Sequence, residues 1–200
     1  MSNIVRLHTP IPEGAIHALR VGQEVLFSGT FITARDEAHR YLVERNDSDP
    51  LPLDLASAVI YHCGPIMRSE PSGWKAISAG PTTSARMELY EPEVIRRYKV
   101  RAIVGKGGMG SETARALAEE GAVYLAAASG AGALLAKRIA AVKSVWKLEE
   151  FGEPEAMWQL EVADFPAIVA MDAHGGDIYK NVLDASSSRL EALRRIPPQK

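Results

Sequence analysis

The order of hydrophobic patterns in the middle of the chain constrains its fold more than any other feature. Residues 101–105 form a short apolar run, a glycine loop follows, and residues 111–120 repeat apolar positions at helical spacing. Gly121 ends that helix, and residues 122–129 form a second apolar run. A strand, loop, helix and strand in this order predict parallel pairing within an α/β domain.

Further strands and helices are predicted on both sides of this unit. The strands are expected at residues 21–34, 57–64, 73–80, 144–152, 157–165 and 166–176. The helices are expected at residues 36–43, 85–98 with a break at Pro92, 129–142 and 186–195. A chain of 200 residues with 46% hydrophobic residues can bury one sizeable core. We therefore predict a single layered α/β domain over residues 1–200 with a mixed, partly parallel sheet.

Composition excludes several classes of function. With 23 basic and 25 acidic residues the net charge is -2, which gives no broad attraction for nucleic acid or an anionic membrane. The first ten residues contain no apolar stretch of signal-peptide length, so we expect a cytoplasmic protein. The single cysteine, Cys63, cannot form an internal disulfide and cannot by itself hold a zinc ion or an iron-sulfur cluster.

Three loops place a cation beside a strand end or a helix start, where α/β proteins tend to bind anions. Arg35 follows the strand 21–34, and Lys106 lies inside the glycine loop. Thr82 and Arg86 are four residues apart in GPTTSAR and can share one face of a helix start. Nearby cations lower the pKa of a hydroxyl, which would let Thr82 move a proton. Helix capping by Thr82 and solvated surface cations are the alternative, purely structural interpretation.

The glycine loop also suggests a nucleotide site. Gly105, Gly107 and Gly110 have the spacing of the dinucleotide fingerprint, between a strand and a helix whose amides could face a pyrophosphate. That fingerprint expects an acidic residue about 20 positions further on, and the sequence has none there. A nucleotide-binding module and a noncatalytic scaffold both stay open as alternatives.

The histidines show no paired spacing typical of a metal site, so no zinc centre is expected. They are His8, His17, His39, His62 and His174. His62 with Cys63, and Asp172 with His174, are local clusters too small to define a nucleophilic triad or a metal shell. Their roles are left unassigned.

Three motifs together resemble one known family. SGTFITARDEAH, AGPTTSARM and IVGKGGM, in that order, are similar to the β subunit or C-terminal domain of the iron-sulfur class I fumarate hydratases and the related tartrate dehydratases. The resemblance runs from Ile11 to Leu193 and includes the later segment MDAHGGDIY. The motif HCGP, with His62 and Cys63, departs from the family, which often has an alanine-type residue there.

The resemblance implies a swivelling β/β/α domain whose active site lies at a junction with an α subunit carrying a 4Fe-4S cluster on three cysteines. It implies reversible hydration of fumarate to malate, with tartrate dehydration as the alternative reaction. Thr82 matches the family's proposed base for the C3 proton. Arg35, Arg86 and Lys106 match its carboxylate-binding cations, and Lys106 joins Thr82 as a catalytic residue because these cations would stabilise charge on the deprotonated carbon.

Overall fold

A computed structural model describes residues 4–46 and 48–194 of the chain. The expected cytoplasmic location rests partly on Met1–Asn3, and the last predicted helix ends at Arg195. These residues lie outside the described range. In the described part of the chain, no helix combines the length and apolar composition that a bilayer span requires.

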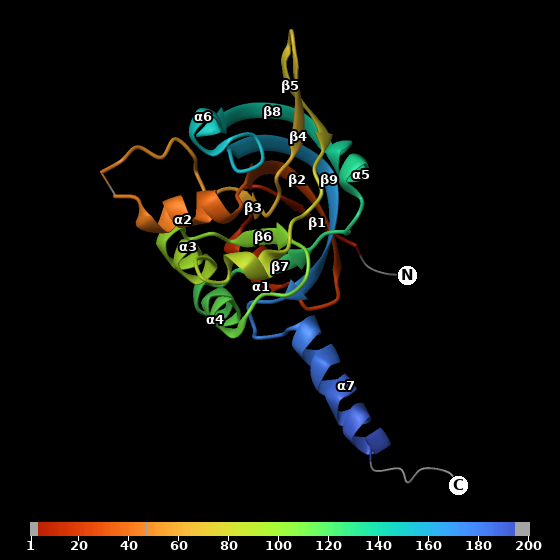
Figure 1. Cartoon of the computed structure of the whole chain (residues 1–200). Coiled ribbons are helices and arrows are strands. Elements are labelled where there is room, and N and C mark those ends of the chain that lie inside the picture. The colour runs from red at the N-terminus through yellow and green to blue at the C-terminus, as the bar shows by residue number, and fades with distance from the viewer. Residues whose placement is uncertain (1–3, 47, 195–200) are drawn as a thin grey trace.

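A mixed sheet of seven strands forms the centre of the described structure (Figure 1). Its strands are β1 (Val5–His8), β2 (Glu24–Thr33), β3 (Val59–Tyr61), β6 (Ala102–Gly105), β7 (Val123–Ala126), β8 (Ile139–Trp146) and β9 (Met157–Met171). Strands β1, β2, β3, β6 and β7 are parallel neighbours in that order. The long strand β9 runs antiparallel to both β7 and β2, so that β2, β3, β6, β7 and β9 close into a barrel.

Helices and a hairpin surround this sheet (Figure 1). The helices are α1 (Glu13–His17), α2 (Asp36–Glu44), α3 (Glu91–Tyr98), α4 (Ser111–Glu120), α5 (Gly132–Ala136), α6 (Leu148–Phe151) and α7 (Ile178–Arg194), with a 3-10 turn η1 (Ser84–Met87). Strands β4 (Ile66–Glu70) and β5 (Gly73–Ser78) form a separate antiparallel hairpin. Both this hairpin and α7 project from the body of the domain.

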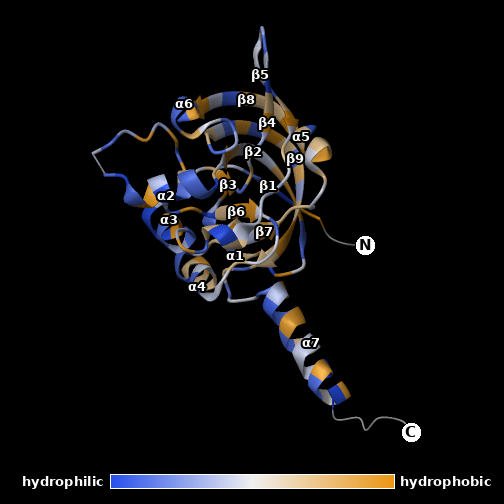
Figure 2. Ribbon diagram, viewed as in Figure 1, coloured by the Kyte–Doolittle hydropathy of each residue, from blue (hydrophilic) through white to orange (hydrophobic). Residues whose placement is uncertain are grey.

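Alternate residues of the strands divide the core into two parts. Phe31, Tyr61 and Val104 belong to the cluster inside the closed sheet, whereas Ile32 and Ile60 belong to the cluster beneath α2, α3 and α4. Successive side chains of a strand point to opposite faces, so both faces of these strands must be apolar. Figure 2 shows the resulting hydrophobic colouring along β3 and β6.

The structure confirms the mixed, partly parallel sheet and the helices at 36–43 and 111–120. The predicted helix 85–98 is divided into η1 and α3, with Pro92 near the start of α3. The prediction of a helix at 129–142 was wrong for residues 139–142, because residues from Ile139 onward pair with β9 as strand β8. The segment 148–151 is helical, and the two strands predicted at 157–176 form the single strand β9. Strand pairing with β9 overrode the local helical pattern of residues 139–142.

Candidate functional site

The carboxyl ends of three neighbouring parallel strands carry two of the predicted site residues and His62, which the sequence left unassigned. Arg35 follows β2, His62 follows β3, and Lys106 follows β6. Since β2, β3 and β6 are adjacent and parallel, their ends meet at one edge of the sheet. Ligands of α/β proteins tend to bind at such an edge.

The segment containing Thr82 is held between the ends of β3 and β6. The Thr82 backbone N–H donates to the His62 carbonyl at 2.7 Å, and the Ser84 N–H donates to the Lys106 carbonyl at 3.1 Å. Thr83 forms an isolated parallel bridge with Lys106. The structure therefore brings the Thr82 segment beside Lys106, although the two residues are far apart along the chain.

Arg35 and Arg86 each lie beside a carboxylate of the chain. Arg86 donates from Nε to Asp36 Oδ1 at 3.1 Å and from Nη2 to Oδ2, which is a bidentate pair. Arg35 Nε lies 3.3 Å from Glu155 Oε1, with its side chain largely buried. Burial of Asp36 is outweighed by the hydrogen bonds and charge of Arg86, so the pKa of Asp36 is lowered. Asp36 is thus an anion under neutral conditions and orients Arg86.

Arg35 and Arg86 are thus already paired with carboxylates of the chain, and Lys106 differs from them. In the described ranges, Lys106 has no ion pair or side-chain hydrogen bond. A Cβ at Gly64 would lie 2.4 Å from Arg35 Nη1, so a glycine lets the guanidinium pack against the β3 end. The predicted residues Arg35, Thr82, Arg86 and Lys106 lie on loops that touch one another, but the described coordinates give no direct hydrogen bond between their side chains.

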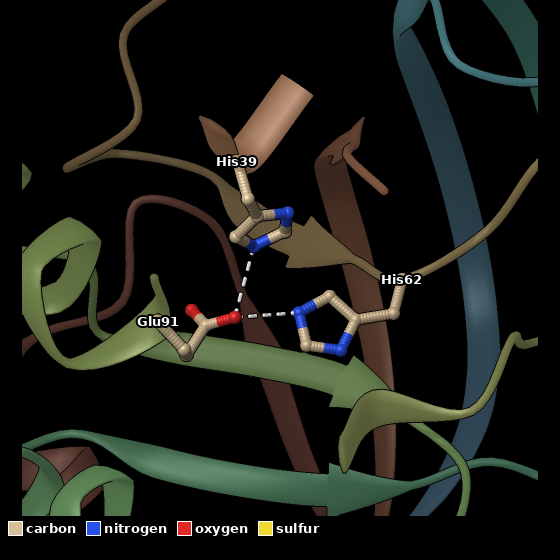
Figure 3. Close-up of side chains that lie close together, drawn as sticks. All are labelled: His39, His62 and Glu91. Atoms are coloured by element: carbon tan, nitrogen blue, oxygen red, sulfur yellow. Dashed lines mark hydrogen bonds and ion pairs between the residues drawn. The ribbon is translucent and has the colours of Figure 1, made fainter. Parts of the chain in front are cut away.

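A fully buried polar cluster lies beneath these loops (Figure 3). Glu91 Oε2 lies 2.9 Å from His39 Nε2 and 2.8 Å from His62 Nε2, so both rings point at one carboxylate oxygen. His39 Nδ1 lies 2.8 Å from the Arg35 carbonyl. His62 Nδ1 lies 2.9 Å from Ser84 Oγ. We call these four side chains, together with Tyr124, the buried network.

Tyr124 extends the network to the glycine loop. Its hydroxyl lies 2.9 Å from Ser84 Oγ and 2.8 Å from the Gly107 carbonyl, and it is buried like the rest. Gly105 is tightly enclosed by the same groups, since a Cβ there would lie 1.9 Å from Ser84 Oγ. The network therefore reaches the loops that carry Arg35, Thr82 and Lys106.

Charges in the network are set by burial and by mutual contacts. Burial opposes ionisation of Glu91, yet the two imidazoles outweigh it and lower the pKa of Glu91 to about 2. Burial also lowers the pKa of His39, but the Glu91 carboxylate outweighs this effect and the pKa is raised. For His62 burial prevails over the same carboxylate, helped by repulsion from His39, and its pKa is lowered. His39 and Glu91 thus form the ion pair, and His62 is neutral.

Sequence reasoning missed His39 and Glu91. They are 52 residues apart, and His62 is 29 residues from Glu91, so no local spacing links them. The available signal was weak: His39 falls among the buried positions of α2, and Glu91 sits in the first turn of α3, where exposed acids are common. His62, left unassigned from the sequence, proves to be their partner.

The other unassigned clusters have structural surroundings. Cys63 is buried, and burial raises the pKa of its thiol to about 12. Asp172 accepts backbone N–H bonds from Val21, His174 and Gly176 at 2.9 to 3.0 Å, so it organises a turn. His174 Nε2 contacts the His17 carbonyl at 2.8 Å.

The helix end expected to face a pyrophosphate is occupied by a side chain of the chain itself. Glu88 Oε2 accepts from the Gly110 N–H at 2.6 Å and from Thr113 Oγ1 at 2.7 Å, and Oε1 accepts from the Thr113 N–H at 3.2 Å. An internal carboxylate therefore satisfies the amides at the start of α4. The amides of Gly110 and Thr113 thus donate to Glu88, which argues against the dinucleotide interpretation of the glycine loop.

Fold and site together define a class of protein: an α/β domain with a partly parallel, closed sheet that presents cations and a threonine at its strand ends, as in anion-binding enzyme domains. The sequence profile of the family "Fumarase C-terminus" matches residues 1–182, so the chain belongs to this family. It is a member of the class I fumarate hydratase and tartrate dehydratase family of hydro-lyases.

Curated relatives cover the chain almost completely. The L(+)-tartrate dehydratase subunit beta of Escherichia coli K12 is 39% identical over 193 residues, which is 96% of this chain and 92% of the relative. A Methanocaldococcus jannaschii protein with the provisional name L(+)-tartrate dehydratase subunit beta is 48% identical over 89% of this chain and 92% of its own length. A Geobacillus stearothermophilus protein with the provisional name fumarate hydratase class I is 43% identical, and the chain spans only 36% of it.

Proposed function

We propose that this chain is the β subunit of a 4Fe-4S-dependent hydro-lyase that interconverts fumarate and malate, active with an α subunit that holds the cluster. One observation supports the proposal: the Thr82 segment is hydrogen-bonded between the ends of β3 and β6, next to Lys106, and Arg35 and Arg86 lie on the adjoining segments. Three cations in one region suit a substrate with two carboxylates. We expect a cytoplasmic complex in which this domain swivels against its partner.

In this proposal, the chain binds the dicarboxylate and handles the proton on carbon. Arg35, Arg86 and Lys106 bind its carboxylates, and Thr82 takes the proton from C3 of malate. Negative charge then develops on that carbon, where Lys106 and the arginines stabilise it, until the C2 hydroxyl leaves as hydroxide and the double bond of fumarate forms. The same cations favour the ionised form of the Thr82 hydroxyl, which is the form that can accept a proton.

The residues of this chain do not fit an iron-sulfur cluster. The sequence has a single cysteine, Cys63, and its buried thiol has a pKa raised to about 12, whereas cluster ligands are thiolates. We therefore assign the cluster to the α subunit. The chain matches 92% of the length of two relatives that are named as beta subunits, and this supports a separate partner chain that carries the cluster.

Anaerobic coexpression with the cluster-bearing subunit tests the proposal. The complex should hydrate fumarate, and Thr82→Ala should lower kcat by about 10² to 10⁴, the usual contribution of a general base, while malate binding measured by calorimetry is retained. Thr83→Ala is the matched control, because Thr83 is the exposed neighbour of Thr82, and it should keep wild-type kcat. An active complex in which Thr82→Ala has wild-type kcat would refute the role of Thr82.

Tartrate dehydration is the second candidate, because two relatives with nearly full mutual coverage carry that name. The ratio of kcat/KM for L(+)-tartrate to that for malate decides between the two substrates. Calorimetry with NAD and ATP tests the nucleotide-binding alternative. A complex inactive on fumarate, malate and tartrate would refute the hydro-lyase proposal.

A further inference from the structure

The buried network connects each loop of the candidate site to the others. His39 Nδ1 contacts the carbonyl of Arg35 itself, and the carbonyl of His62 accepts the Thr82 N–H. Tyr124 contacts the carbonyl of Gly107, one residue after Lys106. Glu91 Oε2 is the atom on which the two histidine branches meet, at 2.9 and 2.8 Å. A single buried oxygen therefore joins the loops that follow β2 and β3.

Counting protons defines the charge of this junction. A carbonyl and a carboxylate only accept hydrogen bonds, so His39, which faces the Arg35 carbonyl and Glu91, must donate from both ring nitrogens. His39 is then an imidazolium paired with the Glu91 carboxylate. His62 needs one N–H, at Nε2 toward Glu91, and its Nδ1 accepts the Ser84 hydroxyl proton. The Tyr124 hydroxyl shares its one proton between two acceptors, Ser84 Oγ and the Gly107 carbonyl.

We propose that Glu91 is a positioning residue, which holds the Arg35 loop and the Thr82 segment in register through the His39 ion pair and the neutral His62. The activity part of this inference rests on the proposed function, whereas the ion pair does not. Glu91 touches none of Arg35, Thr82, Arg86 and Lys106 through its own side chain in the described structure, so it acts through the two imidazoles.

Geometry favours a positioning role over simple packing. All members of the network are fully buried, and a buried charge without its partner is costly. If Glu91 loses its charge, the His39 imidazolium is left unpaired, so we expect His39 to release a proton. Neutral His39 can no longer donate to both Glu91 and the Arg35 carbonyl. Catalytic groups misplaced by about 1 Å can lose about 10²-fold in rate, so a loosened loop is measurable.

Glu91→Gln is the test, because it keeps the shape of the side chain and removes the charge. Glu93→Gln is the matched control, since Glu93 lies on the same helix and is exposed. In the complex with the α subunit, Glu91→Gln should lower kcat at least tenfold per folded site, and Glu93→Gln should not. A purely structural role would lower the melting temperature and leave kcat per folded site unchanged, and that result would overturn the proposal.

Nuclear magnetic resonance of the full chain tests the ion pair without turnover. Imidazole ¹⁵N shifts at pH 8 should show both nitrogens of His39 protonated in the wild type and one in Glu91→Gln. Amide resonances of Arg35 and Thr82 should shift in Glu91→Gln and stay unchanged in Glu93→Gln. A neutral His39 in the wild type, or unmoved loop amides, would overturn the inference. If the wild-type complex is inactive, the proposed function fails and these spectra still decide the ion pair.

Two further measurements cover other outcomes. If Glu91→Gln does not fold, Tyr124→Phe removes only the hydroxyl that reaches the Gly107 carbonyl, and it should raise KM for the dicarboxylate several-fold by loosening the Lys106 loop. Unchanged kinetics in Tyr124→Phe would then overturn the network's role. The two Nε2 atoms and the carboxylate are also a donor set that a divalent metal could use. Stoichiometric metal in the purified chain, lost in Glu91→Gln, would replace the ion pair by a metal centre and overturn the proposal.

Discussion

Replacing Gly105 by alanine should test how closely the buried network is packed. Gly105 ends β6, and its backbone conformation is open to any residue, so the added methyl group acts only through contacts. The new Cβ would lie 1.9 Å from Ser84 Oγ and 3.1 Å from both His62 Nδ1 and the Tyr124 hydroxyl. The last two contacts need shifts of a few tenths of an ångström, whereas the Ser84 hydroxyl must leave its position.

The cost follows from the bonds that the Ser84 hydroxyl makes. It would lose its contacts with His62 and Tyr124, each worth about 1 kcal/mol, and would leave a buried His62 nitrogen unpaired at about 1 to 3 kcal/mol. Gly105→Ala should therefore destabilise the fold by about 3 to 5 kcal/mol. Ser84→Ala loses the same bonds and should therefore also cost about 3 to 5 kcal/mol.

The double variant distinguishes this explanation from a general effect of the methyl group. Without the Ser84 hydroxyl there is room for most of the new Cβ, so adding Gly105→Ala to Ser84→Ala should cost less than about 1 kcal/mol. Urea unfolding of the four proteins, followed by circular dichroism, gives each free energy of unfolding. Costs that add in the double variant, or a neutral Gly105→Ala, would refute the overlap with Ser84.

Three further predictions concern residues outside the network. Asp172→Asn should cost about 2 kcal/mol at pH 7 in urea unfolding. The backbone N–H bonds to Asp172 outweigh its burial and lower its pKa, so the stabilising effect of the carboxylate is present at neutral pH and is lost as the pH falls through the folded-state pKa. A cost that persists at pH 2 would contradict this explanation. Cys63 is buried with a pKa raised to about 12, so iodoacetamide should label it only in denaturant, and rapid labelling of the native chain would contradict its burial. Glu88→Ala should lower the free energy of unfolding by about 1 to 2 kcal/mol, because the first amides of α4 lose their acceptor, whereas Glu112→Ala on the exposed side of the same turn should cost less than half of that.

Local patterns in the sequence predicted several of the elements and named the loops of the candidate site. Apolar alternation and glycine loops predicted β2, β6, α2 and α4, because these patterns reflect burial of neighbouring positions. The motifs around Arg35, Thr82 and Lys106 are also local, and the family match extends over the segments that contain them. A sequence pattern can therefore identify the loops of the candidate site.

How those loops are joined depends on the tertiary structure. Closure of the sheet by β9 turned residues 139–142 from a predicted helix into a strand, because pairing with a long partner outweighed local propensity. His39, His62 and Glu91 are 23 to 52 residues apart in the sequence, and they meet only at one shared, buried carboxylate oxygen. Charge and proton positions there depend on burial and mutual distance, which no spacing along the chain encodes.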